Sequence, residues 1–372
     1  MREEEIIIVG AGLSGLGCAK RLFENGKKFK IISEDIGGRV LTSPDGDVNY
    51  GAYYITEDCR NIKPYVESVR IMDLGDYHFH ENGKDYHLSL WNMMRHGSAL
   101  LRLWSDLREF RKHFNAMRVR SLDESREKLI EADPVLCKYY HGKAGDYIKE
   151  RGLEKLTREF LEQALWGSFF VDCRTVPTFI FLQCLIPMIV PTYSFKMNFP
   201  KIMAGFDDAF VKDSVLGISK TGDGFELNAK SGDVYRAKRL VLATPMTVTN
   251  KLIAPQKIKG TINCSFMHVR GKIKPQYDVR GYNFFGLTEK AAISKETDGT
   301  FLYFYTKGNK ISQYFDSWQV ITAKSWDPAL MLLGDDYVNH NPAPGLYLAN
   351  DHDVASTEDA FISGMQIGKL IL

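Results

Sequence analysis

Three glycines near the start of the chain have a spacing that suits phosphate binding. Gly10, Gly12 and Gly15 stand in the order G-x-G-x-x-G. The first permits a tight turn, the second lets a backbone approach a pyrophosphate, and the third lets a helix pack closely on a strand. The helix would begin at Leu13, so the phosphates would lie at its positive end, where Ser14 adds a hydroxyl. The pattern predicts a dinucleotide site.

A carboxylate at the end of the next strand should bind the adenosine ribose. Ser33 stands eighteen residues after Gly15, and Glu34 follows it. Two interpretations remain open: either Glu34 reaches the ribose hydroxyls after a shift of one residue, or Ser33 makes a weaker contact. Glu34 and Asp35 would repel a phosphorylated ribose, so NADP is not expected.

The apolar pattern predicts the elements that position these residues. Residues 6–9 are an unbroken apolar run, typical of a buried parallel strand. A helix is expected over 13–25 and a second strand over 29–32, which is the context that the glycine pattern requires. Helical patterns rich in Leu, Arg and Phe then occupy much of 60–195. Strands return after about 205, and a last helix is expected from near Ser356 to the end.

Composition limits the class of protein. The chain has 372 residues, 44% hydrophobic and 25% charged, with a net charge of +2. These values are typical of a globular protein of roughly two domains and indicate no nucleic-acid partner. The six cysteines are scattered without zinc-ligand or C-x-x-C spacing, so we expect no metal site and a reducing, cytoplasmic compartment.

One apolar stretch admits two interpretations. Residues 179–191, FIFLQCLIPMIVP, are too short to span a membrane and contain two interrupting prolines, Pro187 and Pro191. We expect a buried helix followed by a turn. The alternative is an exposed apolar surface that gives a membrane-peripheral contact or touches an apolar substrate.

A second motif carries a family resemblance. Gly37-Gly38-Arg39 resembles the second fingerprint of the flavin-containing amine oxidases, phytoene-type desaturases and protoporphyrinogen oxidases. Similar segments recur in the family's order: VNYGAYYI, FELNAKSGDVYRAKRLVLATP, SWDPALM and PGLYLANDHDVASTEDAFISGMQIGKLI. The resemblance implies an α/β fold in which a discontinuous Rossmann-like FAD-binding domain, 1–60, 196–255 and 335–372, carries an inserted α+β substrate domain, 61–195 and 256–334.

The resemblance also implies roles for single residues. Arg39 would neutralise the FAD pyrophosphate, Gly51 and Ala52 would lie against the isoalloxazine, Val215 would hold the adenine through its backbone, and Asp351 would bind the ribityl chain or the phosphates. The absence of a cysteine in the family's tail context implies non-covalent FAD. Together with the first motif, the expected cofactor-binding residues are Gly10, Gly12, Leu13, Ser14, Gly15, Ser33, Glu34, Gly38, Arg39, Gly51, Ala52, Val215 and Asp351.

The C-terminal segment departs from the family at one position and has a capping signal at another. Asn350 stands where the family usually has glycine, so a different local backbone is expected. S-T-E-D at 356–359 matches a capping box. The resemblance implies that this helix N-terminus points at the pyrimidine edge of the flavin, where its dipole would stabilise the reduced form.

Catalytic residues are less clear from the sequence. The strand TINCSFMHV lacks the lysine of the amine oxidases, which leaves His268 as a weak candidate base and Trp326 as a candidate pocket wall. A lone histidine on a strand is equally explained as a satisfied structural residue. His78, His80 and His87 flank an expected hairpin turn at Asn82-Gly83 and are interpreted as one exposed face of that hairpin. The alternative is that the H-x-H pair binds a metal. Residues 301–308 alternate like a strand, which would pack on a sheet or line a substrate tunnel.

Three functions remain open. The first is an FAD-dependent oxidoreductase that takes hydride from a small, mainly apolar organic substrate at a C–C or C–N bond, with oxygen or another acceptor as oxidant; no second G-x-G-x-x-G exists for NAD(P)H. The second is a mutase of the UDP-galactopyranose type, which needs convergent arginines such as Arg102, Arg108 and Arg111. The third is a degenerate flavin-binding member without catalysis.

Overall fold

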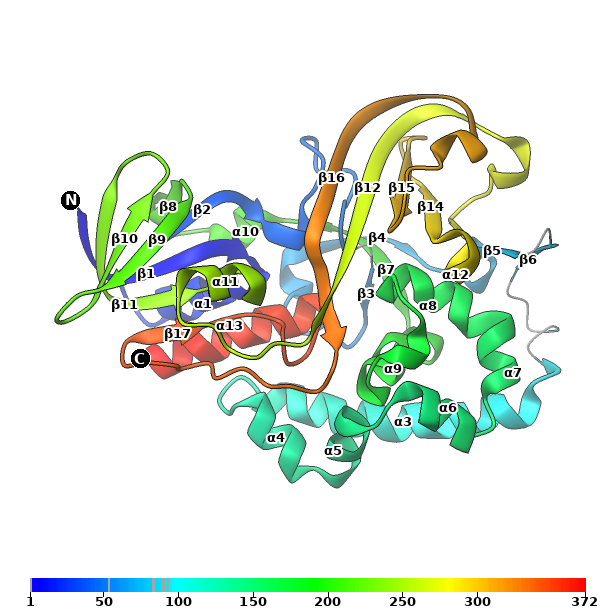
Figure 1. Ribbon diagram of the computed structural model, residues 1–372, viewed down its shortest axis with the longest axis horizontal. Coiled ribbons are helices and arrows are strands. Elements are labelled where there is room, and N and C mark those ends of the chain that lie inside the picture. Colours follow the sequence, from blue (N-terminus) through cyan, green and yellow to red (C-terminus); the bar gives the residue numbers. More distant parts are fainter. Residues whose placement is uncertain (1, 53, 82–83, 88–90, 92–93) are drawn as a thin grey trace.

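The computed structural model describes residues 2–52, 54–81, 84–87, 91 and 94–372 (Figure 1). One sheet carries the N-terminus, and its strand order is β8-β2-β1-β11-β10-β9, with β17 also pairing with β11. The strands β1, β2, β8, β11 and β17 run parallel, while β10 is antiparallel to both of its neighbours. Their bounds are β1 Arg2–Gly12, β2 Lys30–Gly37, β8 Phe210–Lys212, β9 Val215–Lys220, β10 Phe225–Ala229, β11 Val234–Leu242 and β17 Leu346–Leu348.

Two helices from opposite ends of the chain lie side by side on this sheet. They are α1, Leu13–Glu24, and α13, Thr357–Ile371. A side chain at Gly17 or Gly364 would overlap the backbone of the other helix, because the carbonyl oxygens of Phe361 and Ser14 occupy those positions. The two glycines therefore allow the first and last helices to cross closely on this sheet.

The second sheet and the small third sheet lie beside the first. The second has the order β16-β12-β15-β14-β13-β5-β6, and its two longest strands arch away from the first sheet in Figure 1. The third has the order β3-β7-β4. The bounds are β3 Ile55–Thr56, β4 Val66–Ile71, β5 Tyr77–Glu81, β6 Lys84–His87, β7 Thr192–Met197, β12 Gly260–Ile273, β13 Tyr282–Phe284, β14 Ala291–Lys295, β15 Phe301–Tyr305 and β16 Phe315–Leu333.

A helical lobe lies between β6 and β7 in the sequence. Its core includes Phe110, Phe114 and Phe179. The ring of Phe179 meets the rings of Phe110 and Phe114 edge to face, at 5.2 and 5.5 Å between centroids. The helices are α3 Gly97–Arg120, α4 Arg126–Ala132, α5 Pro134–His141, α6 Ala144–Glu150, α7 Glu154–Leu156, α8 Glu162–Phe169 and α9 Thr178–Leu185. Short helices elsewhere are α10 Phe199–Met203, α11 Met246–Leu252 and α12 Gly286–Glu289.

The apolar stretch 179–191 forms most of α9 and the turn after it. Phe179, Phe181 and Leu182 are fully buried, which confirms the prediction of a buried helix. None of the described helices is long and apolar enough to cross a membrane. Residues 301–305 form β15, and Phe301 to Phe304 are buried on both faces of their sheet, so they pack the core.

The glycine motif lies where the sequence predicts it, between β1 and α1, but the second strand is longer than expected. β2 continues to Gly37 because it pairs with β1 again after a register shift, with Ala11 opposite Ile36. The hairpin β5–β6 forms, while its expected turn at Asn82-Gly83 lies outside the described residues. The mixed α/β fold with a Rossmann-like part and a second sheet is as predicted.

Candidate dinucleotide site

The N-terminus of α1 has features that suit an anion. Gly12 is its N-cap residue, the described residues supply no side-chain cap, and the first turn has no acidic residue. A Cβ at Gly12 would meet no other heavy atom of the described residues within 4 Å. By contrast, a Cβ at Gly15 would overlap the Gly10 carbonyl. Gly10 itself has φ +105°, and a Cβ there would overlap the Ala243 carbonyl. The outer glycines serve packing, whereas the middle one faces open space.

The second glycine motif meets the first at the same place. Gly38 has φ +60°, and a Cβ there would lie 3.3 Å from the Cα of Gly12. Next to it, Arg39 donates to an Asp351 carboxylate oxygen at 2.5 Å and to the Ala329 carbonyl at 3.0 Å. The Arg39 side chain remains 28% exposed. Three segments of the chain thus bring a guanidinium, a carboxylate and the uncapped N-terminus of α1 together.

An aromatic wall adjoins these groups. A Cβ at Gly51 would overlap the Arg39 carbonyl and lie 3.7 Å from Cη2 of Trp326. The Ala52 amide donates to that same carbonyl at 3.4 Å. Phe266 lies between two rings, 4.9 Å from Trp326 and 4.9 Å from Tyr50 between centroids. The sequence predicts Trp326 as a pocket wall, but Tyr50 and Phe266 were not predicted. Phe266 lies on β12 and Tyr50 lies outside the named strands, so no local pattern links these two residues.

His268 lies behind the wall and is fully engaged. Its Nδ1 is 3.3 Å from the Tyr50 hydroxyl and its Nε2 is 2.7 Å from the Thr300 hydroxyl. Thr300 in turn donates to Asp298 at 2.6 Å. The side chain is buried, and that burial lowers the pKa of His268. Both ring nitrogens have protein partners, so the geometry favours a structural role over that of a base.

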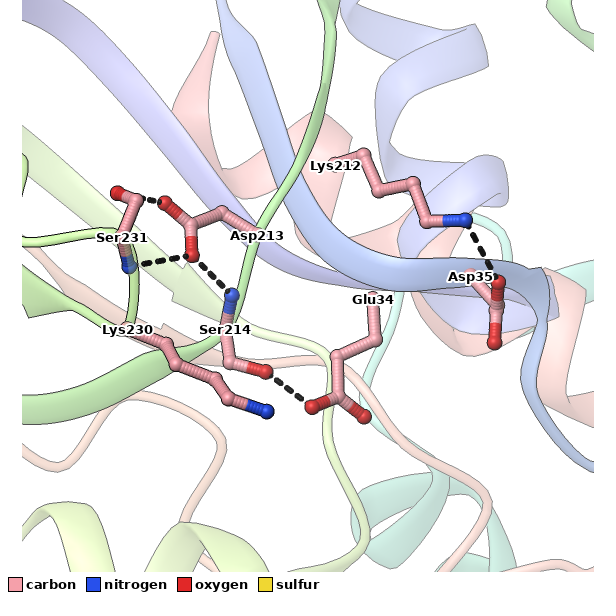
Figure 2. A pocket seen from close by; sticks show the side chains of 7 residues that line it. All are labelled: Glu34, Asp35, Lys212, Asp213, Ser214, Lys230 and Ser231. Carbon is pink, nitrogen blue, oxygen red and sulfur yellow. Dashed lines mark hydrogen bonds and ion pairs between the residues drawn. The ribbon is translucent and has the colours of Figure 1, made fainter.

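The adenosine end of the expected site is an open, charged pocket of about 470 Å³ (Figure 2). The Glu34 carboxylate accepts a hydrogen bond from the Ser214 hydroxyl, and Val215 follows at the start of β9. Ser33 instead uses its hydroxyl locally, donating to the Asp35 carbonyl at 2.8 Å. The pocket is lined by Glu34, Asp35, Lys212, Asp213, Ser214, Lys230 and Ser231.

The N-terminus of α13 differs from that of α1. Ser356 caps it by accepting from the Asp359 amide at 2.9 Å, as the sequence predicts. The Glu358 carboxylate accepts from the backbone amides of Asn61 and Ile62 at 2.8 and 3.0 Å. Both Glu358 and Asp359 are buried in the first turn. These two carboxylates lie at the positive end of the helix dipole, and the stabilisation of reduced flavin by this helix end stays a prediction.

Asp359 joins α13 to the helical lobe. Its carboxylate receives the guanidinium of Arg118 at 2.6 Å and that of Arg126 at 3.5 Å. Arg126 also donates to the Asp359 carbonyl at 2.5 Å. Burial opposes ionisation here, yet the two arginines hold the pKa of Asp359 below its usual range. This buried ion cluster has no counterpart in the sequence-based predictions.

Two further predictions concern residues with local partners. Asn350 is buried, and its side-chain oxygen accepts from the His352 amide at 3.1 Å, so the side chain fixes the backbone where the family has glycine. His80 was expected on an exposed face but is buried, because β13 packs beside β5. It lies 2.7 Å from both Asp85 on β6 and Asn283 on β13, which gives it structural partners.

The arginines expected to converge in a mutase lie along α3 with separate partners. Arg102 donates to the Arg151 carbonyl at 2.8 Å, and Arg111 holds Asp58 through two bonds of 2.7 and 2.8 Å. Arg108 lies over the ring of Trp104 at 4.5 Å. The three side chains do not form one anion site.

Comparison with known proteins agrees with this geometry. Residues 8–69 match the family model of the NAD(P)-binding Rossmann-like domain. A structure of wild-type putrescine oxidase bound to putrescine aligns over 99% of this chain and 98% of its own, at 12% identity and TM-score 0.66. Cyclohexylamine oxidase from Brevibacterium oxydans IH-35A aligns over 99% and 98%, at 13% identity and TM-score 0.68.

An oxidoreductase from Methanosarcina mazei gives a similar result, with 98% of this chain and 99% of its own aligned at 13% identity and TM-score 0.62. No curated protein matches the sequence. The chain therefore shares the fold of putrescine oxidase and cyclohexylamine oxidase over almost its whole length. The family resemblance noted in the glycine motifs and this fold agree.

Proposed function

We propose that this protein is an FAD-dependent oxidoreductase that takes hydride from a small, mainly apolar organic substrate at a C–N or C–C bond. The supporting observation is the convergence of the uncapped α1 N-terminus, the open position at Gly12 and the Arg39–Asp351 pair. The chain in which these groups converge shares its fold with two amine oxidases.

The residues present fit FAD along its length. Backbone N–H groups of α1 would bind the pyrophosphate, with Arg39 supplying positive charge. Glu34 lines the adenosine pocket and is the better candidate for the ribose hydroxyls, since the Ser33 hydroxyl is used locally. Val215 would bind the adenine through its backbone. Bound non-covalently, the flavin supplies a two-electron hydride acceptor, while the protein supplies position and exclusion of water.

The aromatic wall supports an apolar substrate. Trp326 lies against Gly51, the residue expected beside the isoalloxazine, and Phe266 and Tyr50 continue the wall. Such rings exclude water and offer no charge to a polar substrate. His268 has both nitrogens engaged, so no side chain is assigned to remove a proton. Oxygen or another acceptor is the proposed oxidant, and the scattered free cysteines support the proposal of a cytoplasmic location.

The mutase alternative receives no support from the arginines of α3, which have separate partners. A degenerate member without catalysis stays open as an outcome of the test. It would bind FAD weakly or show no reduction of the bound flavin by any organic substrate.

The test is the absorbance spectrum of the protein after reconstitution with FAD, followed by anaerobic addition of apolar amines and of unsaturated hydrocarbons. We expect a flavin spectrum, flavin released by acid precipitation, and bleaching by at least one substrate class. A protein that stays colourless contradicts FAD binding. A coloured protein that no organic substrate bleaches, but that turns over a nucleotide sugar after dithionite reduction, contradicts the oxidoreductase and supports the mutase.

A further inference from the structure

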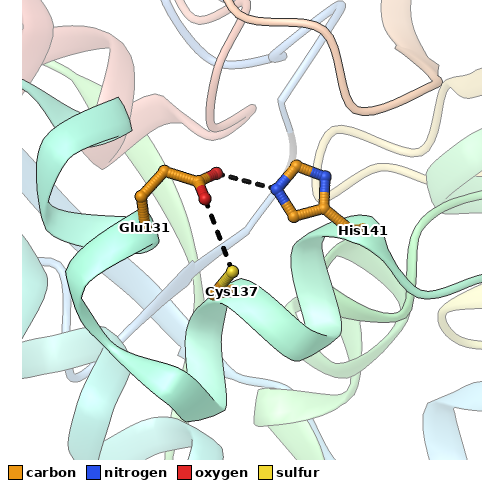
Figure 3. A group of neighbouring side chains, drawn as sticks. All are labelled: Glu131, Cys137 and His141. Carbon is orange, nitrogen blue, oxygen red and sulfur yellow. Dashed lines mark hydrogen bonds and ion pairs between the residues drawn. The ribbon is translucent and has the colours of Figure 1, made fainter.

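Three different ligand types meet on the outside of the helical lobe, away from the dinucleotide site. Glu131 lies at the end of α4, and Cys137 and His141 lie on α5 (Figure 3). Their carboxylate oxygen, sulfur and imidazole nitrogen all lie within 4.8 Å of one another. Figure 3 shows the three side chains pointing toward a common centre.

The backbone explains why these atoms meet. Cys137 and His141 are four residues apart on one helix, so they share a face. The preceding short helix delivers Glu131 to the same face. Its carboxylate lies 2.7 Å from Nε2 of His141 and accepts from the Cys137 thiol at 3.5 Å. Tetrahedral zinc with ordinary bond lengths separates its ligand atoms by about 3.3–3.8 Å, so small side-chain movements would suffice.

Two further residues orient the ligands. Asp335 places a carboxylate oxygen 2.6 Å from Nδ1 of His141. The Tyr337 hydroxyl donates to the Glu131 carboxylate at 2.9 Å. A carboxylate on the distal nitrogen of a histidine is the usual support of a metal-bound imidazole, because it fixes the tautomer and leaves the other nitrogen for the metal.

We propose that Glu131, Cys137 and His141 bind one divalent metal ion of the zinc type. A thiolate and a carboxylate balance the charge of the ion, and the sulfur–nitrogen–oxygen donor set suits a borderline-soft metal. Binding releases two protons, one from the Cys137 thiol and one that Nε2 of His141 shares with Glu131. Glu131 and His141 are each 42% exposed, so a water molecule has access to the fourth position.

This site would connect two parts of the fold. Glu131, Cys137 and His141 belong to the helical lobe, whereas Asp335 and Tyr337 lie between β16 and β17, in the segment that leads to the first sheet. A bound metal would therefore hold the lobe against that segment and raise the thermal stability of the chain. The inference does not depend on the proposed oxidoreductase activity.

The test uses chelator-treated full-length protein titrated with Co²⁺ and then with Zn²⁺. We expect one Co²⁺ per chain with a sulfur-to-cobalt charge-transfer band, displacement by Zn²⁺, and a higher melting temperature with Zn²⁺. C137S should lose the band, and H141Q should weaken Zn²⁺ binding at least about tenfold. D335N, which alters only the supporting carboxylate, should weaken it by about 10–100-fold.

Matched controls come from the same lobe. C184S removes a different thiol, which lies on α9. H113Q removes a histidine that pairs with Asp133 at 2.7 Å. Both should bind Co²⁺ and Zn²⁺ like the wild type. Proton release measured by calorimetry in two buffers should approach two per metal ion. Absence of stoichiometric binding, a band that persists in C137S, or an equal loss in C184S would overturn the proposal.

Discussion

Two helix N-termini reach the same region of this molecule but differ in their capping and in the charges of their first turns. α1 begins at Gly12 with no acidic residue in its first turn and no side-chain cap from the described residues. α13 begins after Ser356, which caps it, and its first turn buries Glu358 and Asp359. Both ends carry the same partial positive charge. One leaves that charge for a ligand, whereas the other satisfies it with the chain's own carboxylates.

The difference separates binding from assembly. At α1, the uncapped N-terminus and the open position at Gly12 suit the diphosphate of the proposed cofactor. At α13, the Asp359 carboxylate is held by Arg118 and Arg126 of the helical lobe, and Glu358 is held by the backbone at Asn61. The first and last helices therefore have unequal roles, although they cross closely at Gly17 and Gly364.

Removing the charge at Asp359 should have the largest effect. D359N keeps the shape of the side chain but leaves Arg118 and Arg126 buried without their anion. Loss of one partner of a buried ion cluster costs about 3–5 kcal/mol, so the melting temperature should fall by several degrees. E124Q, which breaks an exposed pair with Arg120, is the control and should melt like the wild type. Equal melting of the two variants would show that the α13 cluster does not hold the lobe.

The next test compares two glycines of the first motif. G12A places a methyl group in open space, so the free energy of unfolding should change little while the affinity for FAD falls about 10–100-fold. G15A forces a methyl group onto the Gly10 carbonyl and should destabilise the fold itself. Thermal melting and FAD titration of both variants separate the two roles. Normal FAD affinity in G12A would exclude the α1 N-terminus as the pyrophosphate site.

A smaller effect is expected at Arg39. R39K keeps a positive charge but loses the planar fork that bridges Asp351 and the Ala329 carbonyl. The affinity for FAD should fall about tenfold, with the dissociation rate carrying most of the change. K212R, on the rim of the adenosine pocket where Lys212 lies 3.6 Å from Asp35, is the matched basic control. A change in K212R as large as that in R39K would argue against a specific role for Arg39.

The sequence predicted the parts of the fold whose signals are local. Gly10, Gly12 and Gly15 restrict the backbone within a few residues, so their spacing alone was enough to place the strand, turn and helix around them. The cap at Ser356 is equally local and was found. The far end of β2 was missed, because its pairing resumes after a register shift that depends on β1 rather than on its own residues.

What the sequence could not show depends on contacts between distant segments. His268 was ambiguous because its partners, Tyr50 and Thr300, lie in segments remote from it along the chain. Arg118 and Asp359 are 241 positions apart in the sequence, so the local pattern of neither segment indicates that they pair. The cluster proposed as a metal site was not singled out from the sequence, because spacing was sought between cysteines. The cluster combines a Cys-x-x-x-His helix face with a carboxylate from the preceding helix.

A last, smaller effect concerns a buried pair, His340 and Asp353, in the chain between β16 and α13. His340 lies 2.7 Å from Asp353, and its Nδ1 lies 2.7 Å from the Leu348 carbonyl; Arg126 opposes its charge. Burial disfavours the imidazolium, yet Asp353 raises the net pKa of His340. Burial likewise opposes ionisation of Asp353, but His340 holds the pKa of that carboxyl far below its usual range.

The sign of the pH effect follows from these two directions. The raised pKa of His340 stabilises the fold below the unfolded value of about 6.5, and this contribution disappears as the pH rises through the folded value. The lowered pKa of Asp353 stabilises above about 3.9 and is lost only in strong acid. The melting temperature of the wild type should therefore exceed that of H340Q most at about pH 5.5 and least at about pH 9. A gap that stays constant over this range would mean that folding leaves the pKa of His340 unchanged, and a gap that shrinks below about pH 6.5 would mean that His340 is neutral in the fold. In either case the charges supporting α13 would end at Arg118 and Arg126.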